Sequence, residues 1–120
     1  MKQFFAFILL LWLALPVVNA QLQNPGFEEY SSLPDNTGQF SRAIGWSNAG
    51  STASSPDYYH YSANASADLP LTPMASVNAP QGSALMGFCA TGINTANTRE
   101  YLSTQFTSPL EVGKEYVLSF

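Results

Sequence analysis

The chain has 120 residues, a formal net charge of −4 and only 10% charged side chains. This composition excludes a typical nucleic-acid-binding protein, because such proteins need clustered Lys and Arg and the cations here are few and scattered. The single cysteine, Cys89, excludes a small secreted fold held together by internal disulfides. The length leaves room for one small domain, whose stability must come from its core.

The first twenty residues have the pattern of a secretory signal peptide. Lys2 gives a positive start, Phe4–Leu15 is an unbroken apolar run, and Val18–Ala20 places small residues before a cleavage site. The rival interpretation is a transmembrane anchor, but the run is shorter than the ~20 residues that a span needs and no basic cluster follows it. We therefore predict a leader at 1–20, a mature domain at 21–120 and a secreted or outer-surface protein without a transmembrane span.

The mature part consists of short apolar runs separated by turn residues, and no stretch shows sustained helical periodicity. This pattern is typical of an all-β sandwich or barrel with about six strands. The part opens with a turn at Asn24-Pro25-Gly26, followed by Phe27 as a predicted buried anchor. The clearest strand candidates are Ala43–Trp46, Asp57–Tyr61, Ser83–Ala90, Arg99–Phe106 and Glu115–Phe120.

Three stretches rich in small and polar residues predict loops. They are Tyr30–Ser41, Ser47–Pro56 and Ser62–Pro80. The third is the longest and contains three prolines, and loops of such length are usually functional or mobile.

The last two strand candidates alternate apolar and polar residues, so each has one predominantly apolar face. Pro109 ends the first and Gly113 permits a turn, and the short connection predicts an antiparallel pair. A lone pair of strands is marginal in water, so we expect this pair to belong to a larger sheet. The residues predicted to face the core are Leu102, Phe106, Leu118 and Phe120.

Several motifs follow one another in a characteristic order. They are Asn24–Glu29 (NPGFEE), Gly45-Trp46, Ser55–Tyr59 (SPDYY), Gly82–Gly87 (GSALMG), Arg99–Leu102 (REYL) and Ser108–Phe120 (SPLEVGKEYVLSF). This order resembles the N-terminal domain of secreted surface proteins of gliding, Bacteroidetes-type bacteria, and it is similar to carbohydrate-binding modules of the galactose-binding-like kind. The resemblance implies an antiparallel jelly-roll β-sandwich within an exported protein of the gliding-motility and type IX secretion kind.

Two features depart from that family. Its members often have a cysteine just after the aromatic cluster, where Tyr61-Ser62-Ala63 stands here. A jelly roll has eight strands, and six candidates do not complete one. The resemblance therefore implies a domain that continues past Phe120, so we expect this chain to be a fragment. The alternative is a complete six-stranded sandwich, which would leave its last strand as an aggregation-prone edge.

The residues favour a protein without catalytic activity. There is no G-x-S-x-G nucleophile motif. The only histidine, His60, lies in an aromatic run, and we predict that it is a partly exposed neighbour of these aromatic residues rather than a catalytic base. The acidic residues form no recognisable catalytic pair, and no His/Cys spacing suits zinc. Cys89 lies in an apolar run and is predicted to be a small buried hydrophobe rather than a nucleophile.

Aromatic side chains with polar neighbours suit the C–H faces and hydroxyls of sugars. The predicted ligand-binding residues are Trp46, Asp57, Tyr59, Tyr61 and Arg99. Trp46 has an alternative role in the core, where a small sandwich needs a large side chain. Strand alternation places Tyr58 and His60 on one face and Tyr59 and Tyr61 on the other, so only one of these two pairs can line a given site.

Glu28 is the candidate metal ligand. The resemblance implies that the glutamate of the opening Phe-Glu motif helps to hold a structural calcium, which binds carboxylate and backbone oxygens. The alternative is a surface acid, and no other cofactor is predicted.

Together these observations predict a non-catalytic, secreted or cell-surface β-sandwich domain that binds a carbohydrate or another surface ligand. The first alternative is a structural, adhesin or envelope-assembly module without a small ligand. The second is an accessory domain of a secreted hydrolase. The expected partner is a glycan or a component of the cell envelope.

Overall fold

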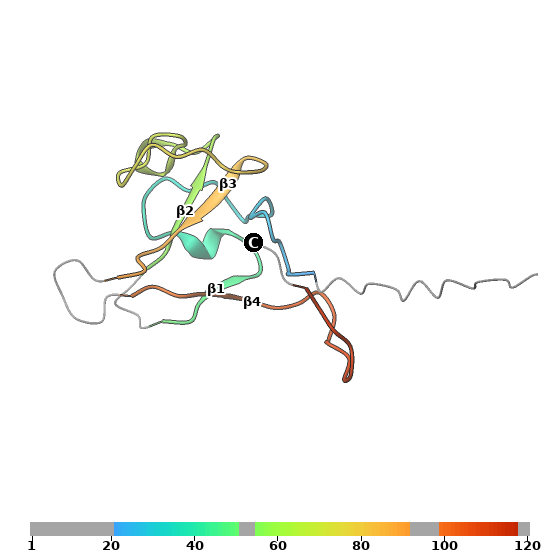
Figure 1. Ribbon diagram of the computed structural model, residues 1–120. Helices are drawn as coiled ribbons and strands as arrows, with labels where there is room; N and C mark the ends of the chain where they lie inside the picture. Colours follow the sequence, from blue (N-terminus) through green and yellow to red (C-terminus); the bar gives the residue numbers. More distant parts are fainter. Residues whose placement is uncertain (1–20, 51–54, 92–98, 118–120) are drawn as a thin grey trace, which may run out of the picture.

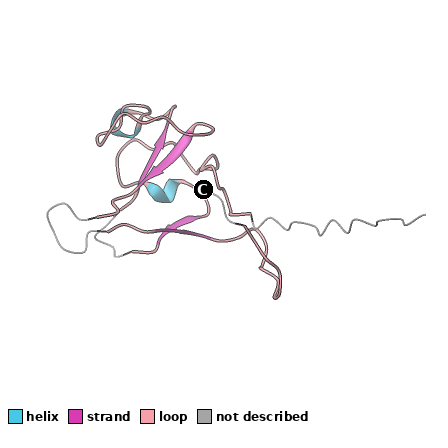
Figure 2. Cartoon of the chain, viewed as in Figure 1, coloured by secondary structure: helices cyan, strands magenta, loops and turns pink. Residues whose placement is uncertain are grey.

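The computed structural model describes residues 21–50, 55–91 and 99–117 (Figure 1). The predicted leader lies outside these residues. The described chain has four short strands, two 3-10 turns and long connecting loops (Figure 2). In order these elements are η1 (Phe40–Arg42), β1 (Trp46–Asn48), β2 (Asp57–His60), η2 (Ala65–Ala67), β3 (Ala84–Gly87) and β4 (Leu102–Thr104). The prediction of an all-β chain is thus confirmed.

The strands form two separate antiparallel ribbons, β2–β3 and β1–β4. In the β2–β3 ribbon Asp57 lies opposite Gly87 and Tyr59 opposite Leu85, while the alternate pair of Tyr58 and Met86 faces the other side. β2 contains two adjacent tyrosines, and aromatic residues favour strands; the strand predicted within Asp57–Tyr61 is confirmed. The predicted strand at Ser83–Ala90 is also found, shortened to Ala84–Gly87.

The β1–β4 ribbon corrects the predicted strand pair at the end of the chain. β4 lies where a strand was expected, but its partner is β1, with Ser47 opposite Ser103. After β4, the chain pairs with the start of the described residues: Leu22 forms a bridge with Phe106, and the N–H of Gln23 donates to the carbonyl of Gln105 (2.8 Å). Alternation predicts an extended run but not its partner, and two segments distant in sequence supply that partner here.

The predicted strand Glu115–Phe120 is wrong over its described half, because residues 115–117 adopt no strand. Residues 118–120, with Leu118 and Phe120, lie outside the described residues. The two other predicted core residues are not in the buried core: Leu102 is half-buried and Phe106 is 39% exposed.

The strand predicted at Ala43–Trp46 begins at Trp46 instead and continues into the predicted loop. Gly45 explains the shift, because its φ of +83° places it in the left-handed region, which interrupts an extended strand. Ala43 is nonetheless buried and forms a bridge with Tyr30.

A small core lies on one face of the β2–β3 ribbon. Its buried members are Ala43, Tyr58 and Ala84, with Phe27, Trp46 and Met86 partly buried against them. The rings of Phe27 and Trp46 lie 4.8 Å apart at an interplanar angle of 44°. Phe27 packs against the core, as predicted, but it is only partly buried rather than buried.

Asn24 joins three segments beneath this core. Its side-chain N–H groups donate to the carbonyls of Glu29 and Ile44 (2.8 Å each), and its Oδ1 accepts from the N–H of Glu29 (3.1 Å). Its own carbonyl accepts from the indole N–H of Trp46 (2.8 Å). Asn24 has a φ of +48°, a conformation that asparagine tolerates better than most residues. Asn24 is thus buried and bonded to Glu29, Ile44 and Trp46, whereas Pro25 of the predicted turn is exposed.

The predicted loop Ser62–Pro80 contains only η2 and short turns. Within it Leu71 forms a bridge with Ser76, and the hydroxyl of Thr72 accepts from the N–H of Ala75 (3.1 Å) and donates to the carbonyl of the same residue (2.8 Å). These bonds give residues 70–77 a defined hairpin-like shape beside the β2–β3 ribbon. Within the described chain, no helix is long and apolar enough to cross a membrane.

Candidate ligand-binding pocket

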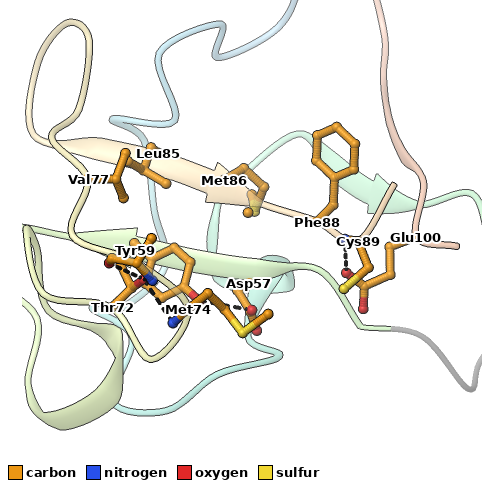
Figure 3. Close-up of a pocket in the computed structure, with 12 residues that line it drawn as sticks. Asp57, Tyr59, Thr72, Met74, Val77, Leu85, Met86, Phe88, Cys89 and Glu100 are labelled. Carbon is orange, nitrogen blue, oxygen red and sulfur yellow. Dashed lines mark hydrogen bonds between the residues drawn. The ribbon is translucent and has the colours of Figure 1, made fainter. Parts of the chain in front are cut away.

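The face of the β2–β3 ribbon opposite the core borders a pocket of about 410 Å³ (Figure 3). This volume falls within the range of roughly 300–1,000 Å³ that is usual for small-ligand sites. The floor comes from the two strands, and the loop at 70–80 supplies one wall. The lining residues are Asp57, Tyr59, Thr72, Met74, Ala75, Val77, Leu85, Met86, Gly87, Phe88, Cys89 and Glu100.

The ring of Tyr59 lies across the floor. A Cβ atom at Gly87 would lie 2.9 Å from Cε2 of Tyr59, closer than real side chains allow. The glycine in β3 therefore permits the close approach of the Tyr59 ring to the opposite strand. The side chain of Tyr59 is 3% exposed, so it shapes the pocket more than it projects into it.

Asp57 holds the polar end of Tyr59. Oδ2 of Asp57 accepts from the Tyr59 hydroxyl (2.9 Å), and Oδ1 accepts from the N–H of Gly38. Burial, together with the hydrogen bond to Asp57 and its negative charge, raises the pKa of Tyr59 well above its ordinary value. The phenol, which is neutral at pH 7 even at its ordinary pKa, therefore stays protonated and able to donate to Asp57 further into the alkaline range.

Glu100 is the second carboxylate of the pocket. Its Oε1 accepts from the N–H of Ser55 (3.0 Å) and its Oε2 from the N–H of Cys89 (2.7 Å). The N–H of Glu100 in turn donates to the carbonyl of Cys89 (2.9 Å). Glu100 thus fastens the segment after β3 to the start of the β2 segment. Asp57 and Glu100 lie toward the end of the pocket where Gly87 ends β3, whereas Leu85 and Val77 lie toward the other end (Figure 3).

Apolar side chains remain accessible at this pocket. Met74 is 68% exposed, Phe88 57% and Val77 39%. Large apolar groups gathered around a concave site indicate binding, whereas single exposed hydrophobic residues are ordinary.

Of the five predicted ligand-binding residues, the structure brings Asp57 and Tyr59 together in the pocket. Trp46 lies against the core with its indole N–H bonded to Asn24, which is the alternative role weighed for it. Tyr61 is 40% exposed, and its hydroxyl donates to Oδ1 of Asn78 (3.1 Å), outside the pocket lining. Arg99 is exposed and does not line the pocket either.

The alternation predicted for the aromatic cluster is found for Tyr58, Tyr59 and His60; Tyr61 lies beyond the end of β2. Tyr58 is fully buried on the core face, and its hydroxyl donates to the carbonyl of Phe27 (2.9 Å). His60 was expected to be partly exposed, but it is 6% exposed, with its ring edge-on to that of Tyr30 (5.3 Å between ring centroids). The reason is that His60 shares the face of Tyr58, which packs inward. Cys89, predicted to be buried, is half-buried at the pocket and is not in a disulfide.

Glu28, the candidate calcium ligand, binds backbone N–H groups. Its Oε1 accepts from Ser83 (2.8 Å) and Ala84 (3.1 Å), just where β3 begins. A Cβ atom at Gly82 would lie 2.2 Å from the same oxygen. Among the residues that the structure describes, no group of three or more His, Cys, Asp or Glu side chains could hold a metal ion. The calcium site remains a prediction drawn from the resemblance.

Five lining residues were not among the predicted ligand-binding residues: Met74, Val77, Leu85, Phe88 and Glu100. Two features of the sequence bear on them. The long proline-containing loop was expected to be functional or mobile, and Gly87 inside a strand indicates a close approach. Neither feature specifies which loop residues reach the ribbon. In comparisons with known proteins, no family model, no curated protein and no solved structure matches the chain.

Proposed function

We propose that this chain is a non-catalytic binding domain of an exported protein, and that it holds a carbohydrate or a similar surface ligand in the pocket beside Tyr59. The observation that carries the proposal is the pocket itself, because it combines an accessible apolar lining with fixed polar groups. Export is supported by the leader-like pattern of residues 1–20. The proposed architecture is a jelly-roll sandwich, supported by the pairing of β1 with β4, which joins strands more than fifty residues apart.

The pocket residues have roles that suit a sugar. Phe88, being more than half exposed, offers an aromatic face on which a C–H face of a sugar ring can rest. The carboxylates of Asp57 and Glu100 are acceptors for hydroxyl groups, since each ionised carboxylate has about four acceptor positions and protein donors occupy two of these. Because these donors also fix the carboxylates in place, little ordering would be needed on binding.

A glycan array with the whole exported chain tests this proposal. Two matched variants identify the site: Phe88→Ala removes the aromatic face in the pocket, and Phe106→Ala removes a phenylalanine outside it. We expect a loss of affinity of about fivefold to thirtyfold for Phe88→Ala only, since stacking of this kind contributes about 1–2 kcal/mol. Absence of binding to any glycan, or equal loss in both variants, would reject the proposal.

A second candidate function is assembly within the cell envelope. The segment after β4 leads away from the two ribbons (Figure 1) and exposes apolar side chains, with Leu110 at 48%, Val117 at 67% and Val112 fully exposed. Such side chains suit contact with another protein. Envelope pull-downs with the native chain and with Val112→Asp separate the two functions: loss of a captured partner on substitution, with glycan binding absent, would favour assembly.

A further inference from the structure

The lining of the pocket carries negative charge. If the pocket binds a carbohydrate, as proposed above, this charge restricts which carbohydrates can bind. Two carboxylates line the pocket, and among the described residues its lining contains no Lys, Arg or His side chain. Arg42 pairs with Asp35 (3.0 Å) and Lys114 lies 3.9 Å from Glu111, both outside the lining. Arg99 precedes Glu100 in sequence but is not a lining residue.

The hydrogen bonds to the carboxylates do not remove this charge. The donors are the backbone N–H groups of Gly38, Ser55 and Cys89 and the hydroxyl of Tyr59, all of which are neutral. Burial and the charge of Asp57 raise the pKa of Tyr59, so this donor stays neutral as well. The pocket therefore has fixed acceptors and uncompensated negative charge, and an anionic ligand would be repelled from it.

The lining of the pocket favours a sugar ring with several donors over a lone ammonium group. Asp57 of β2 and Glu100, just before β4, lie toward the same end of the pocket and offer acceptors to one ligand. Phe88 and Met74 add accessible apolar surface at the same pocket. A flat sugar ring can rest its C–H face on apolar groups while its amine and hydroxyl groups donate to the two carboxylates.

We propose that the pocket selects glycans that carry free amino groups and rejects acidic glycans. An amine that donates to a carboxylate forms a charge-assisted hydrogen bond, and such bonds are about twice as strong as neutral ones. Acetylation of the amine removes its charge while keeping one donor. Affinity for a deacetylated amino sugar is therefore expected to exceed affinity for its N-acetylated form by roughly tenfold to hundredfold.

Calorimetric titration of the whole exported chain at about pH 6, where amines are protonated, tests the inference. The probes are a fully deacetylated glucosamine tetramer, its N-acetylated form, a galacturonic acid tetramer and tetralysine. We expect the deacetylated sugar to bind tightest and the galacturonate not to bind. Raising NaCl from about 50 to about 500 mM should reduce the difference in affinity between the deacetylated and N-acetylated sugars, because salt screens charge.

Two variants locate the effect. Glu100→Gln removes a charge in the pocket and Glu29→Gln removes an exposed charge outside it. Only Glu100→Gln should reduce the difference in affinity between the deacetylated and N-acetylated probes. The salt titration of the native chain provides a second measurement if Glu100→Gln fails to fold.

Each contrary result has a distinct meaning. Three results would overturn the proposed charge selection: equal affinity for the two glucosamine tetramers, tight binding of galacturonate, or an affinity difference that salt does not change. None of these results contradicts glycan binding itself. Tetralysine binding as tightly as the deacetylated sugar assigns the pocket to basic peptides and overturns the sugar assignment. If no sugar binds here or on the glycan array, the proposed function itself is rejected.

Discussion

The two faces of the β2–β3 ribbon show how differently two adjacent tyrosines can be used. Tyr58 is completely buried, packs with Ala43 and Ala84, and donates its hydroxyl to the carbonyl of Phe27. Tyr59 is 3% exposed, donates to the carboxylate of Asp57 and forms the floor of the pocket. The core face is closed by apolar contacts, whereas the opposite face is covered only in part. We infer that the first face provides stability and the second provides recognition.

The largest expected effect is on the core face. Tyr58→Ala should lower the free energy of unfolding by about 3–5 kcal/mol, because it removes a fully buried aromatic ring and leaves a cavity. Urea denaturation followed by tryptophan fluorescence measures this change. A loss below about 1 kcal/mol would contradict the assignment of this face as the core.

The junction where β3 begins should be the next most sensitive position. Gly82 has a φ of +71°, and a methyl group there would collide with the carboxylate of Glu28. Gly82→Ala is expected to cost about 2–3 kcal/mol from backbone strain and from displacement of Glu28. In a double-mutant cycle, Glu28→Ala should cost much less in the Gly82→Ala background than in the native chain. Additive losses would show that Glu28 does not hold β3 in solution.

Alkaline pH should destabilise both faces. Burial raises the folded-state pKa of Tyr58, with a smaller contribution from the charge of Glu28, and the pKa of Tyr59 is also raised. Because the unfolded phenols lose their protons first, stability is complete below pH 10, the ordinary pKa, and falls above it.

Above pH 10, the ordinary tyrosine pKa, the free energy of unfolding should fall by at most about 1.4 kcal/mol per pH unit for each tyrosine. Urea midpoints between about pH 8 and 11 measure it, and Tyr58→Phe and Tyr59→Phe should each reduce the slope. A pH-independent midpoint in the native chain would contradict the burial of these hydroxyls.

The pocket carboxylates should have smaller effects on stability. Glu100→Gln replaces one of two accepting oxygens, so we expect a loss of about 1–2 kcal/mol from the bonds to Ser55 and Cys89. The matched substitution Glu29→Gln should change stability by less than about 0.5 kcal/mol, because that side chain is exposed. Chemical denaturation of the two variants gives the comparison. Equal values would mean that the bonds made by Glu100 add nothing to stability.

Phe88→Ala should lower ligand affinity while leaving the stability of the domain nearly unchanged. The free energy of unfolding should change by less than about 1 kcal/mol, since the ring is more than half exposed, while ligand affinity falls about fivefold to thirtyfold. Paired denaturation and binding measurements test this separation. A large loss of stability would place Phe88 in the core, and it would contradict the assignment of stability to one face of the β2–β3 ribbon and of recognition to the other.

Local patterns in the sequence were sufficient for some of these features. The aromatic run at Asp57–His60 has high strand propensity, and its alternation correctly separated Tyr58 and His60 from Tyr59. The turn at Asn24 and the anchoring of Phe27 also followed from local chemistry. Three of the five predicted ligand-binding residues lie outside the pocket. Trp46 and Tyr61 bond to Asn24 and Asn78, which are distant in sequence, and Arg99 is exposed.

The sequence by itself determined that this chain is all-β, where β2, β3 and β4 lie, and which side of β2 each residue faces. These properties depend on turn residues and on the two-residue period of a strand, both of which are local. Only the tertiary structure decided that β4 pairs with β1 and that the loop at 70–80 stands beside Tyr59. Strand partners and pocket walls depend on contacts across many intervening residues, and no local pattern encodes which distant segment will supply them.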